Sequence, residues 1–246
     1  MRLILSTARS EFSPVTTYQY AGSELEIFEK AHNWKAYLRR SMQPYLTGSV
    51  LEVGAGLGAN TRQFACLNFD RWTCLEPDLA LLRQIEPGGP LLDRHETILG
   101  DIQALDPARH FDAILYVDVL EHIEDDAGEL IRASRHLSPG GALIVLSPAH
   151  PWLFTPFDRA IGHYRRYTKE SLQAVAPPEL HQEKLVYLDS VGLLASLGNR
   201  LLLDSSMPTA AQIKAWDSVL VQCSRLLDPL LGGMVGKSAL GIWRNV

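Results

Sequence analysis

The chain has 246 residues, of which 46% are hydrophobic and 21% are charged, and its formal net charge is −5. This length suffices for one α/β domain with a full hydrophobic core. The acidic balance gives no support for a nucleic-acid partner, which would usually show as a basic face.

Three further features concern the compartment. No uninterrupted apolar run reaches the roughly 18–20 residues of a membrane span, so we expect no stable membrane insertion. The apolar stretch near the start of the chain is too short for a secretory signal. The three cysteines form no Cys-x-x-Cys pair, which argues against a disulfide framework. We therefore expect a cytoplasmic protein.

The first predicted element is a helix from Ser23 to about Tyr45, because apolar residues recur there at spacings of three and four. These residues are Leu25, Phe28, Ala31, Trp34 and Leu38. Pro44 marks the end of the pattern. We expect this helix, within an N-terminal region 1–47, to cover the site as a lid.

Strand and helix signals then alternate to the end of the chain. The predicted strands are 49–53, 71–76, 97–100, 111–117, 142–147, 183–188 and 238–245. The predicted helices are about 58–67, 78–86, 125–137, 168–176, 190–203 and 209–227. The sequence Pro139-Gly140-Gly141 reads as a turn into the fifth strand.

This alternation predicts a single α/β domain. We expect a Rossmann-like, doubly wound sheet of seven mostly parallel strands with helices on both faces. Residues 48–150 would form its core, and 151–246 would supply a substrate loop, a helical insertion and the last strand. In such sheets ligands bind at the carboxyl ends of the strands, so the loops there should face one crevice.

The most specific local signal is the turn after the first strand, where residues 50–58 read VLEVGAGLG. Glycine lets backbone N–H groups approach a ligand without a Cβ in the way, and here Gly54 and Gly56 would do so. The carboxylate of Glu52 lies just before the turn. Together these residues predict a nucleoside-containing cofactor.

A dinucleotide cofactor is the alternative that must be weighed. Gly54-x-Gly56-x-x-Ala59 meets the looser dinucleotide fingerprint, and Glu76 follows about 20 residues on, where an acid would hold a ribose hydroxyl. However, Glu52 would repel a pyrophosphate at this turn. The same carboxylate would favour the ammonium group of S-adenosylmethionine (SAM), directly or through water.

Two later segments also favour SAM. After the third strand, Asp101 can accept a hydrogen bond from an adenine amino group, and Ile102 can cover the ring. After the fourth strand, residues 116–123 read YVDVLEHI and carry polar groups into the crevice where the reactive end of a cofactor would lie.

At these residues the chain resembles class I SAM-dependent methyltransferases, specifically over 48–150 and more loosely outside it. The matching segments, in the order of that family's motifs, are LEVGAGLG at 51–58, LEPD at 75–78, GDI at 100–102, VDVLEH at 117–122 and LSPGG at 137–141 with the strand after it. The resemblance implies SAM as cofactor, S-adenosylhomocysteine as product, and an antiparallel last strand.

The resemblance also implies roles for individual residues. Gly54 and Gly56 would shape the methionine loop, and Glu76 would hold both ribose hydroxyls. The complete set of expected cofactor contacts is Glu52, Gly54, Gly56, Glu76, Pro77, Asp101, Ile102, Val117, Asp118, Val119 and His122, with Trp34 and Tyr37 covering the cofactor from the lid.

A metal site is the second alternative, at Asp118, Glu121 and His122. If a helix starts near Asp118, these positions share one face and could ligate a divalent cation. The segment resembles that of ubiquinone-pathway O-methyltransferases, whose matching acid, Glu and His are linked to metal. Asp118 replaces their first Glu, however, and Glu-His is common in methyltransferases without metal. We expect pocket lining and no metal.

The loop 149–169 should choose the substrate, since it follows the fifth strand. Its Gly-His-x-Arg-Arg-Tyr stretch is similar to one in bacterial methyltransferases of mostly unassigned substrate. The candidate bases are His150 and His163, the candidate aromatic walls are Trp152, Phe154 and Tyr164, and the candidate carboxylate-binding groups are Arg165 and Arg166. The two arginines could instead latch the loop to the core together with Asp158.

Residues 190–231 form an apolar helical insertion that is longer than the usual connection. It could cap the pocket, pack plainly, form a homodimer face or touch a membrane. The leading hypothesis for the whole chain is a small-molecule methyltransferase, with oxygen slightly favoured over nitrogen or carbon. The alternatives are a SAM-using cyclase or lyase, which would release methylthioadenosine, and a non-catalytic SAM-binding subunit.

Overall fold

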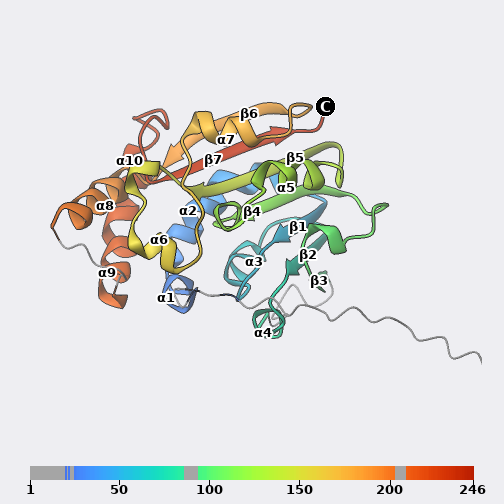
Figure 1. Cartoon of the computed structure of the whole chain (residues 1–246), viewed down its shortest axis with the longest axis horizontal. Helices are drawn as coiled ribbons and strands as arrows, with labels where there is room; N and C mark the ends of the chain where they lie inside the picture. Colours follow the sequence, from blue (N-terminus) through green and yellow to red (C-terminus); the bar gives the residue numbers. More distant parts are fainter. Residues whose placement is uncertain (1–19, 21, 23–24, 86–93, 203–208) are drawn as a thin grey trace, which may run out of the picture.

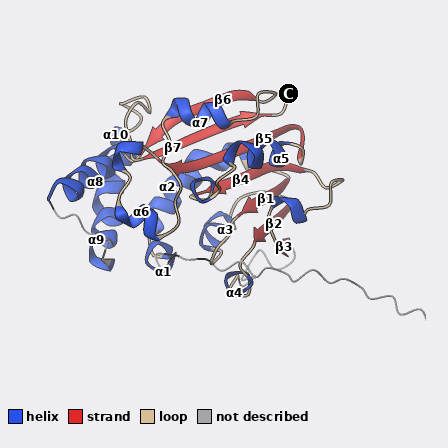
Figure 2. Cartoon of the chain, in the orientation of Figure 1, coloured by secondary structure: helices blue, strands red, loops and turns tan. Residues whose placement is uncertain are grey.

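The computed structural model describes residues 20, 22, 25–85, 94–202 and 209–246. Seven strands form one sheet in the order β3-β2-β1-β4-β5-β7-β6 (Figure 2). Their bounds are β1 Ser49–Val53, β2 Arg71–Glu76, β3 His95–Leu99, β4 Phe111–Val117, β5 Leu137–Pro148, β6 His181–Leu188 and β7 Ser238–Arg244. Strand β7 runs antiparallel to both of its neighbours, β5 and β6, and the pairs formed among β1 to β5 are parallel. The predicted mostly parallel sheet and its antiparallel last strand are confirmed.

Helices cover both faces of this sheet. One face packs on α2 (His32–Met42), α3 (Ala59–Phe64) and α10 (Val221–Leu227), and the other on α5 (Asp126–Ser134) and α7 (Lys169–Val175). Successive strand residues alternate between the two cores: Val50 joins the first and Leu51 the second. Because both faces of the central strands are buried, apolar residues occupy consecutive positions in them, as in Val50 and Leu51.

The order of the strands in the sheet determines where the site lies. Strand β1 pairs with β2 on one side and with β4 on the other, so the chain reverses its direction of winding between them. The loops that follow β1 and β4 therefore diverge and leave a crevice at their carboxyl ends. Figure 1 shows α6 (Pro156–Ala160), α8 (Ser190–Leu202), α9 (Ala210–Ala215) and α1 (Leu25–Glu29) gathered at this end of the sheet.

The predicted lid helix is broken in the structure. Helix α1 ends at Glu29, and α2 begins at His32 and runs into a 3₁₀ turn at Gln43–Tyr45; residues 23 and 24 of the prediction lie outside the described residues. The insertion supplies the reason, because Asp217 accepts hydrogen bonds from the backbone N–H groups of Asn33 at 3.2 Å and Trp34 at 2.8 Å. A helix start capped by a distant carboxylate leaves no local sequence signal.

The expected turn at 139–141 is wrong. These residues belong to β5, which begins at Leu137, and the pairing with β4 shifts register between Phe111 and Ala113. Gly140 has a φ of 77° and donates its N–H to the carbonyl of Asn245 at 2.7 Å. The Pro-Gly-Gly stretch is therefore an irregularity within the strand.

The insertion is anchored by two buried carboxylates. Asp228 accepts hydrogen bonds from the hydroxyl of Tyr37 at 2.7 Å and from the N–H of Asp189 at 2.7 Å. Asp189 in turn accepts from the indole of Trp216 at 2.7 Å. A π-helical segment, Trp216–Leu220, joins α9 to α10. Among the described residues, no helix has the length and apolarity needed to cross a membrane.

Candidate functional site

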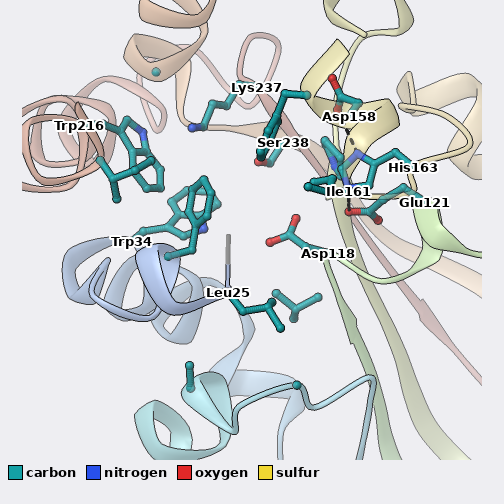
Figure 3. A pocket seen from close by; sticks show the side chains of 18 of the residues that line it. Leu25, Trp34, Asp118, Glu121, Asp158, Ile161, His163, Trp216, Lys237 and Ser238 are labelled. Atoms are coloured by element: carbon teal, nitrogen blue, oxygen red, sulfur yellow. Dashed lines mark hydrogen bonds and ion pairs between the residues drawn. The ribbon is translucent and has the colours of Figure 1, made fainter. Parts of the chain in front are cut away.

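A cavity of about 610 Å³ lies at the carboxyl ends of the strands (Figure 3). Its floor is the turn between β1 and α3 and the end of β4. Its walls come from α1, α2, α6 and the insertion. The apolar lining is formed by Leu25, Phe28, Trp34, Leu38, Val117, Leu153, Phe157, Ile161, Ile213, Trp216 and Leu220. Apolar surface with a few charged groups is typical of a small-molecule site.

The glycine turn borders this cavity as the sequence predicts. Gly54 and Gly56 line it with φ values of 66° and 55°. A Cβ at position 54 would lie 2.6 Å from Cγ2 of Val119. The backbone thus forms a cradle that only glycine permits, which fits a cofactor lying close to the turn. Val119 supports the turn from below and is not among the cavity-lining residues.

The carboxylate of Glu76 holds this turn. It accepts hydrogen bonds from the N–H groups of Gly56 and Asp78, at 2.8 and 2.9 Å. Burial raises the pKa of Glu76, and these two bonds oppose the shift. An ionised carboxylate offers about four lone-pair sites, so two remain beyond these bonds. Glu76 is not itself among the residues that line the cavity, and its contact with a ribose stays a prediction. Pro77 lies in the bend between Glu76 and Asp78, which caps α4 (Leu79–Leu82).

Glu52 occupies a different place from the one expected. Its carboxylate is buried and accepts hydrogen bonds from the hydroxyl of Thr61 and from the indole of Trp72 at 2.9 Å. Thr61 belongs to α3, and Glu52 is not among the residues that line the cavity. The geometry thus gives Glu52 a role between strand and helix, in place of the predicted contact with the ammonium group.

We expect the stability of the protein to fall with rising pH because of Glu52. Burial raises its pKa from 4.5 to about 7 despite the bonds from Thr61 and Trp72. The folded state therefore holds a proton that the unfolded state has lost, and about 3 kcal/mol of stability disappears between pH 4.5 and 7. Glu52→Gln should flatten this decline in urea unfolding measured from pH 4.5 to 8. The exposed control Glu124→Gln should follow the wild type, and parallel profiles for all three proteins would contradict the assignment.

The expected adenine contacts lie outside the cavity lining. Asp101 is exposed and accepts a hydrogen bond from the N–H of Gln103 at 2.9 Å, which caps a 3₁₀ turn. Ile102 is only 1% exposed and packs in the core on the face covered by α5. This packing leaves little of Ile102 for a base to contact, contrary to the prediction. Residues 86–93, which precede β3, lie outside the described residues.

Asp118 faces the centre of the cavity, as Figure 3 shows. It follows β4 with a φ of 53°, and Val117 and His122 line the cavity beside it. Burial raises the pKa of Asp118, and its electrostatic interaction with the neighbouring His163 opposes this shift. Lys35 lines the same cavity, and burial lowers its pKa to about 8. The cavity thus holds both an acid and an amine.

Of the two candidate bases, the structure brings only His163 to the cavity. Its Nδ1 lies 2.9 Å from Oδ1 of Asp158, which accepts the N–H. His150 instead donates from Nε2 to the carbonyl of Gly236 at 2.8 Å, stacks on Tyr187, and is not among the lining residues. The geometry therefore gives no support to His150 as a base, because the residue does not line the cavity.

The two arginines act as latches. Arg166 donates from Nε and Nη2 to the two oxygens of Asp158, at 2.8 and 3.0 Å, within the cavity wall. Arg165 donates to Asp126 at 2.9 Å and to the carbonyl of Glu124 at 2.7 Å. The expected fork onto a substrate carboxylate is thus replaced by an internal one, which corresponds to the alternative weighed from the sequence.

The aromatic walls also differ from the prediction. Trp152 and Tyr164 are 48% and 53% exposed, and Phe154 lies under the guanidinium of Arg159. None of the three predicted aromatic residues lines the cavity. Their neighbours Leu153, Phe157 and Ile161 do, at intervals of four residues. The loop contains the short helix α6, which begins with a capping box between Thr155 and Asp158. The spacing of four residues between Leu153, Phe157 and Ile161 is the sequence pattern that could have identified them as lining residues.

The lid contributes Trp34 but not Tyr37 to the lining. The hydroxyl of Tyr37 is instead bound to Asp228, as described above. Sequence reasoning missed Trp216 and Lys237, which face the cavity from the insertion and from the residue before β7. The Lys237 ammonium lies 3.8 Å from the centre of the Trp216 ring and 3.6 Å from Asp189. The helical spacing of the insertion was a signal for Trp216; nothing local singles out Lys237.

The comparisons with known proteins agree with this geometry. A family model described as a methyltransferase domain matches residues 26–182. Demethylmenaquinone methyltransferase of Tropheryma whipplei (strain Twist) is 31% identical over 157 residues, 61% of this chain and 61% of that protein. Trans-aconitate 2-methyltransferase of Deinococcus radiodurans is 29% identical over 163 residues, 62% of this chain and 61% of that protein. The chain thus spans about three fifths of the length of these curated relatives.

A solved structure of similar fold is an S-adenosylmethionine-dependent methyltransferase from Mesorhizobium loti. It superposes with a TM-score of 0.60 at 17% identity and covers 88% of this chain and 99% of that one. At this identity the likeness shows the shared fold. The family match, the relatives, the glycine cradle and the sheet order all agree. The chain belongs to the class I SAM-dependent methyltransferases, and SAM is its cofactor.

Proposed function

We propose that the protein transfers a methyl group from SAM to a small molecule bound in the 610 Å³ cavity. The observation that carries this proposal is the continuity of the cavity, which begins at the Gly54–Gly56 cradle and extends along the wall formed by Trp34 of the lid and Trp216 of the insertion, whose ring centres lie 5.7 Å apart. A cofactor on the cradle and an acceptor beside this pair of tryptophans would share one space. The bound cofactor supplies a methyl group on a positively charged sulfur.

The residues of the chain would act chiefly by positioning. Gly54 and Gly56 would admit the cofactor to the turn, and Glu76 would accept hydrogen bonds from its ribose. The apolar walls would exclude water and orient the acceptor, and orientation alone can contribute about 7 kcal/mol or more to a displacement. Trp34 closes the space from the lid side.

We favour an oxygen acceptor over nitrogen or carbon. A hydroxyl acceptor needs a proton acceptor. Among the lining residues we take Asp118 and His163 as the candidates, and Asp158 orients the ring of His163. The curated relatives named above act on a quinone precursor and on aconitate, by their names. These names support a small-molecule acceptor and leave its reacting atom to experiment.

Methyl-labelled SAM incubated with the purified protein and a panel of quinols, phenols, carboxylic acids and amines would test the proposal. Label transferred to one class of acceptor, together with S-adenosylhomocysteine in equal amount, is the expected result. Methylthioadenosine as product would instead support a cyclase or lyase. SAM binding without turnover of any kind across the panel would favour a binding subunit.

The neighbouring residues Phe157 and Phe154 offer a matched pair for the acceptor pocket. Phe157 lines the cavity and Phe154 does not. Removing one apolar side chain from a contact costs about 1.5–3 kcal/mol, so Phe157→Ala should raise the KM of the acceptor by about tenfold or more. Phe154→Ala should change it less than about twofold. Equal effects in steady-state kinetics would contradict this placement of α6.

A further inference from the structure

Three side chains at the cavity wall bring their ligand atoms together. Within the part of the chain that the structure describes, Glu121, His122 and His163 each offer one oxygen or nitrogen, and these atoms lie within 4.8 Å of one another. Glu121 and His122 come from the 3₁₀ turn Leu120–His122 after β4, and His163 comes from the loop after α6. Figure 3 shows Glu121 and His163 adjacent at the edge of the cavity.

The carboxylate of Glu121 lacks the partners that its burial demands. The residue is 0% exposed, and neither carboxylate oxygen accepts a hydrogen bond from the described residues. Nε2 of His163 lies 3.8 Å from Oε1, which is too long for a hydrogen bond. Buried charges are ordinarily paired or bound to metal. A cation between these groups would supply the missing partner.

The histidine of this cluster is already oriented for such a cation. Nδ1 of His163 is held by Asp158, which Arg166 and Thr155 fix in turn. This leaves Nε2 turned toward Glu121. A carboxylate that accepts the second ring N–H is the usual support of a metal-bound histidine, because it fixes the tautomer and makes the ligating nitrogen more basic.

We propose that Glu121, His122 and His163 bind a divalent transition-metal ion at the wall of the cavity. Two imidazoles and one carboxylate suit Zn²⁺, Mn²⁺ or Fe²⁺, whereas Mg²⁺ and Ca²⁺ prefer oxygen ligands alone. Three protein ligands leave coordination positions open, as in sites where a metal meets a substrate. All three residues border the cavity, so an acceptor could reach these positions.

This site differs from the one weighed in the sequence. The site considered in the sequence analysis takes all its ligands, Asp118 among them, from a single motif. The sequence favours pocket lining without metal for that motif. The structure replaces Asp118 by His163, which is 42 residues from Glu121 in the chain (163 minus 121). With His163 bound to the ion, Asp118 is the one of the two proposed proton acceptors that is left for the substrate. The site goes beyond the proposed function, and its test needs no acceptor.

The test is metal binding by chelator-treated full-length protein. Titration with MnCl₂ followed by electron paramagnetic resonance, and with ZnSO₄ by calorimetry, should show one equivalent bound. Glu121→Gln and His163→Gln should each weaken binding at least about tenfold, the lower end of the loss seen when even an outer-shell partner is removed. The exposed His181 provides the matched control, and His181→Gln should bind as the wild type does.

Each outcome decides the proposal. Absence of a bound equivalent for both ions overturns it, and so does unchanged affinity in either folded variant. Circular dichroism checks the fold of both variants, and if Glu121→Gln does not fold then His163→Gln decides alone. SAM binding is measured by calorimetry on the same metal-free protein. A protein that binds SAM but neither ion leaves the proposed function standing without the metal, whereas failure to bind SAM counts against the proposed function.

Discussion

Replacing Asp158 by Ala is expected to lower the free energy of unfolding by about 3–5 kcal/mol, because it leaves a largely buried guanidinium without its carboxylate. Asp158 is 0% exposed, and the side chain of Arg166 is 15% exposed. The same carboxylate accepts hydrogen bonds from His163 and from the N–H and hydroxyl of Thr155, at 2.8 to 2.9 Å. One substitution therefore removes the cap at the start of α6, the latch from Arg166 and the support of the His163 ring.

Urea unfolding at pH 7 measures this effect. The exposed Asp70 is the matched control, and Asp70→Ala should change stability by less than about 0.5 kcal/mol. In the double variant Asp158→Ala with Arg166→Met, the unpaired charge is gone, so part of the lost stability should return. An equal small loss for Asp158→Ala and Asp70→Ala would show that the Asp158 contacts contribute nothing.

The pH dependence of this contribution has a definite sign. Burial alone would raise the pKa of Asp158, but the hydrogen bonds from His163 and Arg166 outweigh it and hold the pKa well below its ordinary 3.8. The folded state thus binds fewer protons than the unfolded state in acid. The stabilisation is complete above pH 3.8 and is lost as the pH falls further. The difference between wild type and Asp158→Ala should therefore shrink in strong acid.

The strands could be predicted because buried strands have a recognisable sequence pattern. Both faces of β1, β2 and β4 are covered, so each contains apolar residues at consecutive positions, and the predicted bounds of all three agree with the structure. Gly54 after β1 is likewise explained by local geometry, because Val119 approaches the turn too closely for a Cβ there. These features depend on local geometry that any sequence with this fold must satisfy.

The loop over the site could not be predicted in the same way. Its short helix α6 starts at Pro156 and is followed by Gly162, so the sequence reads as irregular. An aspartate is rarely fully buried, and only the meeting of Asp158 with Arg166 and His163 makes its burial favourable. Which residues of this loop line the cavity depends on that contact. It is a tertiary contact, and no local sequence pattern indicates it.

Some of the predicted cofactor residues lie where the sequence places them, and others do not. Gly54, Gly56 and Asp118 border the cavity as predicted, because the ends of β1 and β4 must lie together at the reversal of the sheet. Glu52 departs from the prediction because of residues that a motif does not contain. Trp72 on the neighbouring strand and Thr61 on α3 both bond its carboxylate. A motif therefore fixes the position of a residue more reliably than the direction of its side chain.

Replacing Glu76 by Ala is expected to weaken SAM binding by about tenfold or more, because a charge-assisted hydrogen bond is worth roughly 1.5–3 kcal/mol. Glu76 is 4% exposed, and its two oxygens already hold the N–H groups of Gly56 and Asp78. Isothermal titration calorimetry with SAM measures the change. The exposed Glu124 is the matched control, and Glu124→Ala should bind as the wild type does. Unchanged affinity in Glu76→Ala would remove Glu76 from the cofactor site.

A loss of affinity has two physical sources that must be separated. Without its carboxylate the turn also loses the bond to Gly56, so a weaker ligand could reflect a looser cradle alone. Comparing S-adenosylhomocysteine with an analogue that lacks the ribose hydroxyls distinguishes the two. If Glu76 accepts those hydroxyls, the wild type prefers the natural ligand and Glu76→Ala loses most of that preference. If Glu76 only shapes the turn, both ligands weaken by the same factor and the preference survives, because the double-mutant cycle then shows no coupling between carboxylate and hydroxyl.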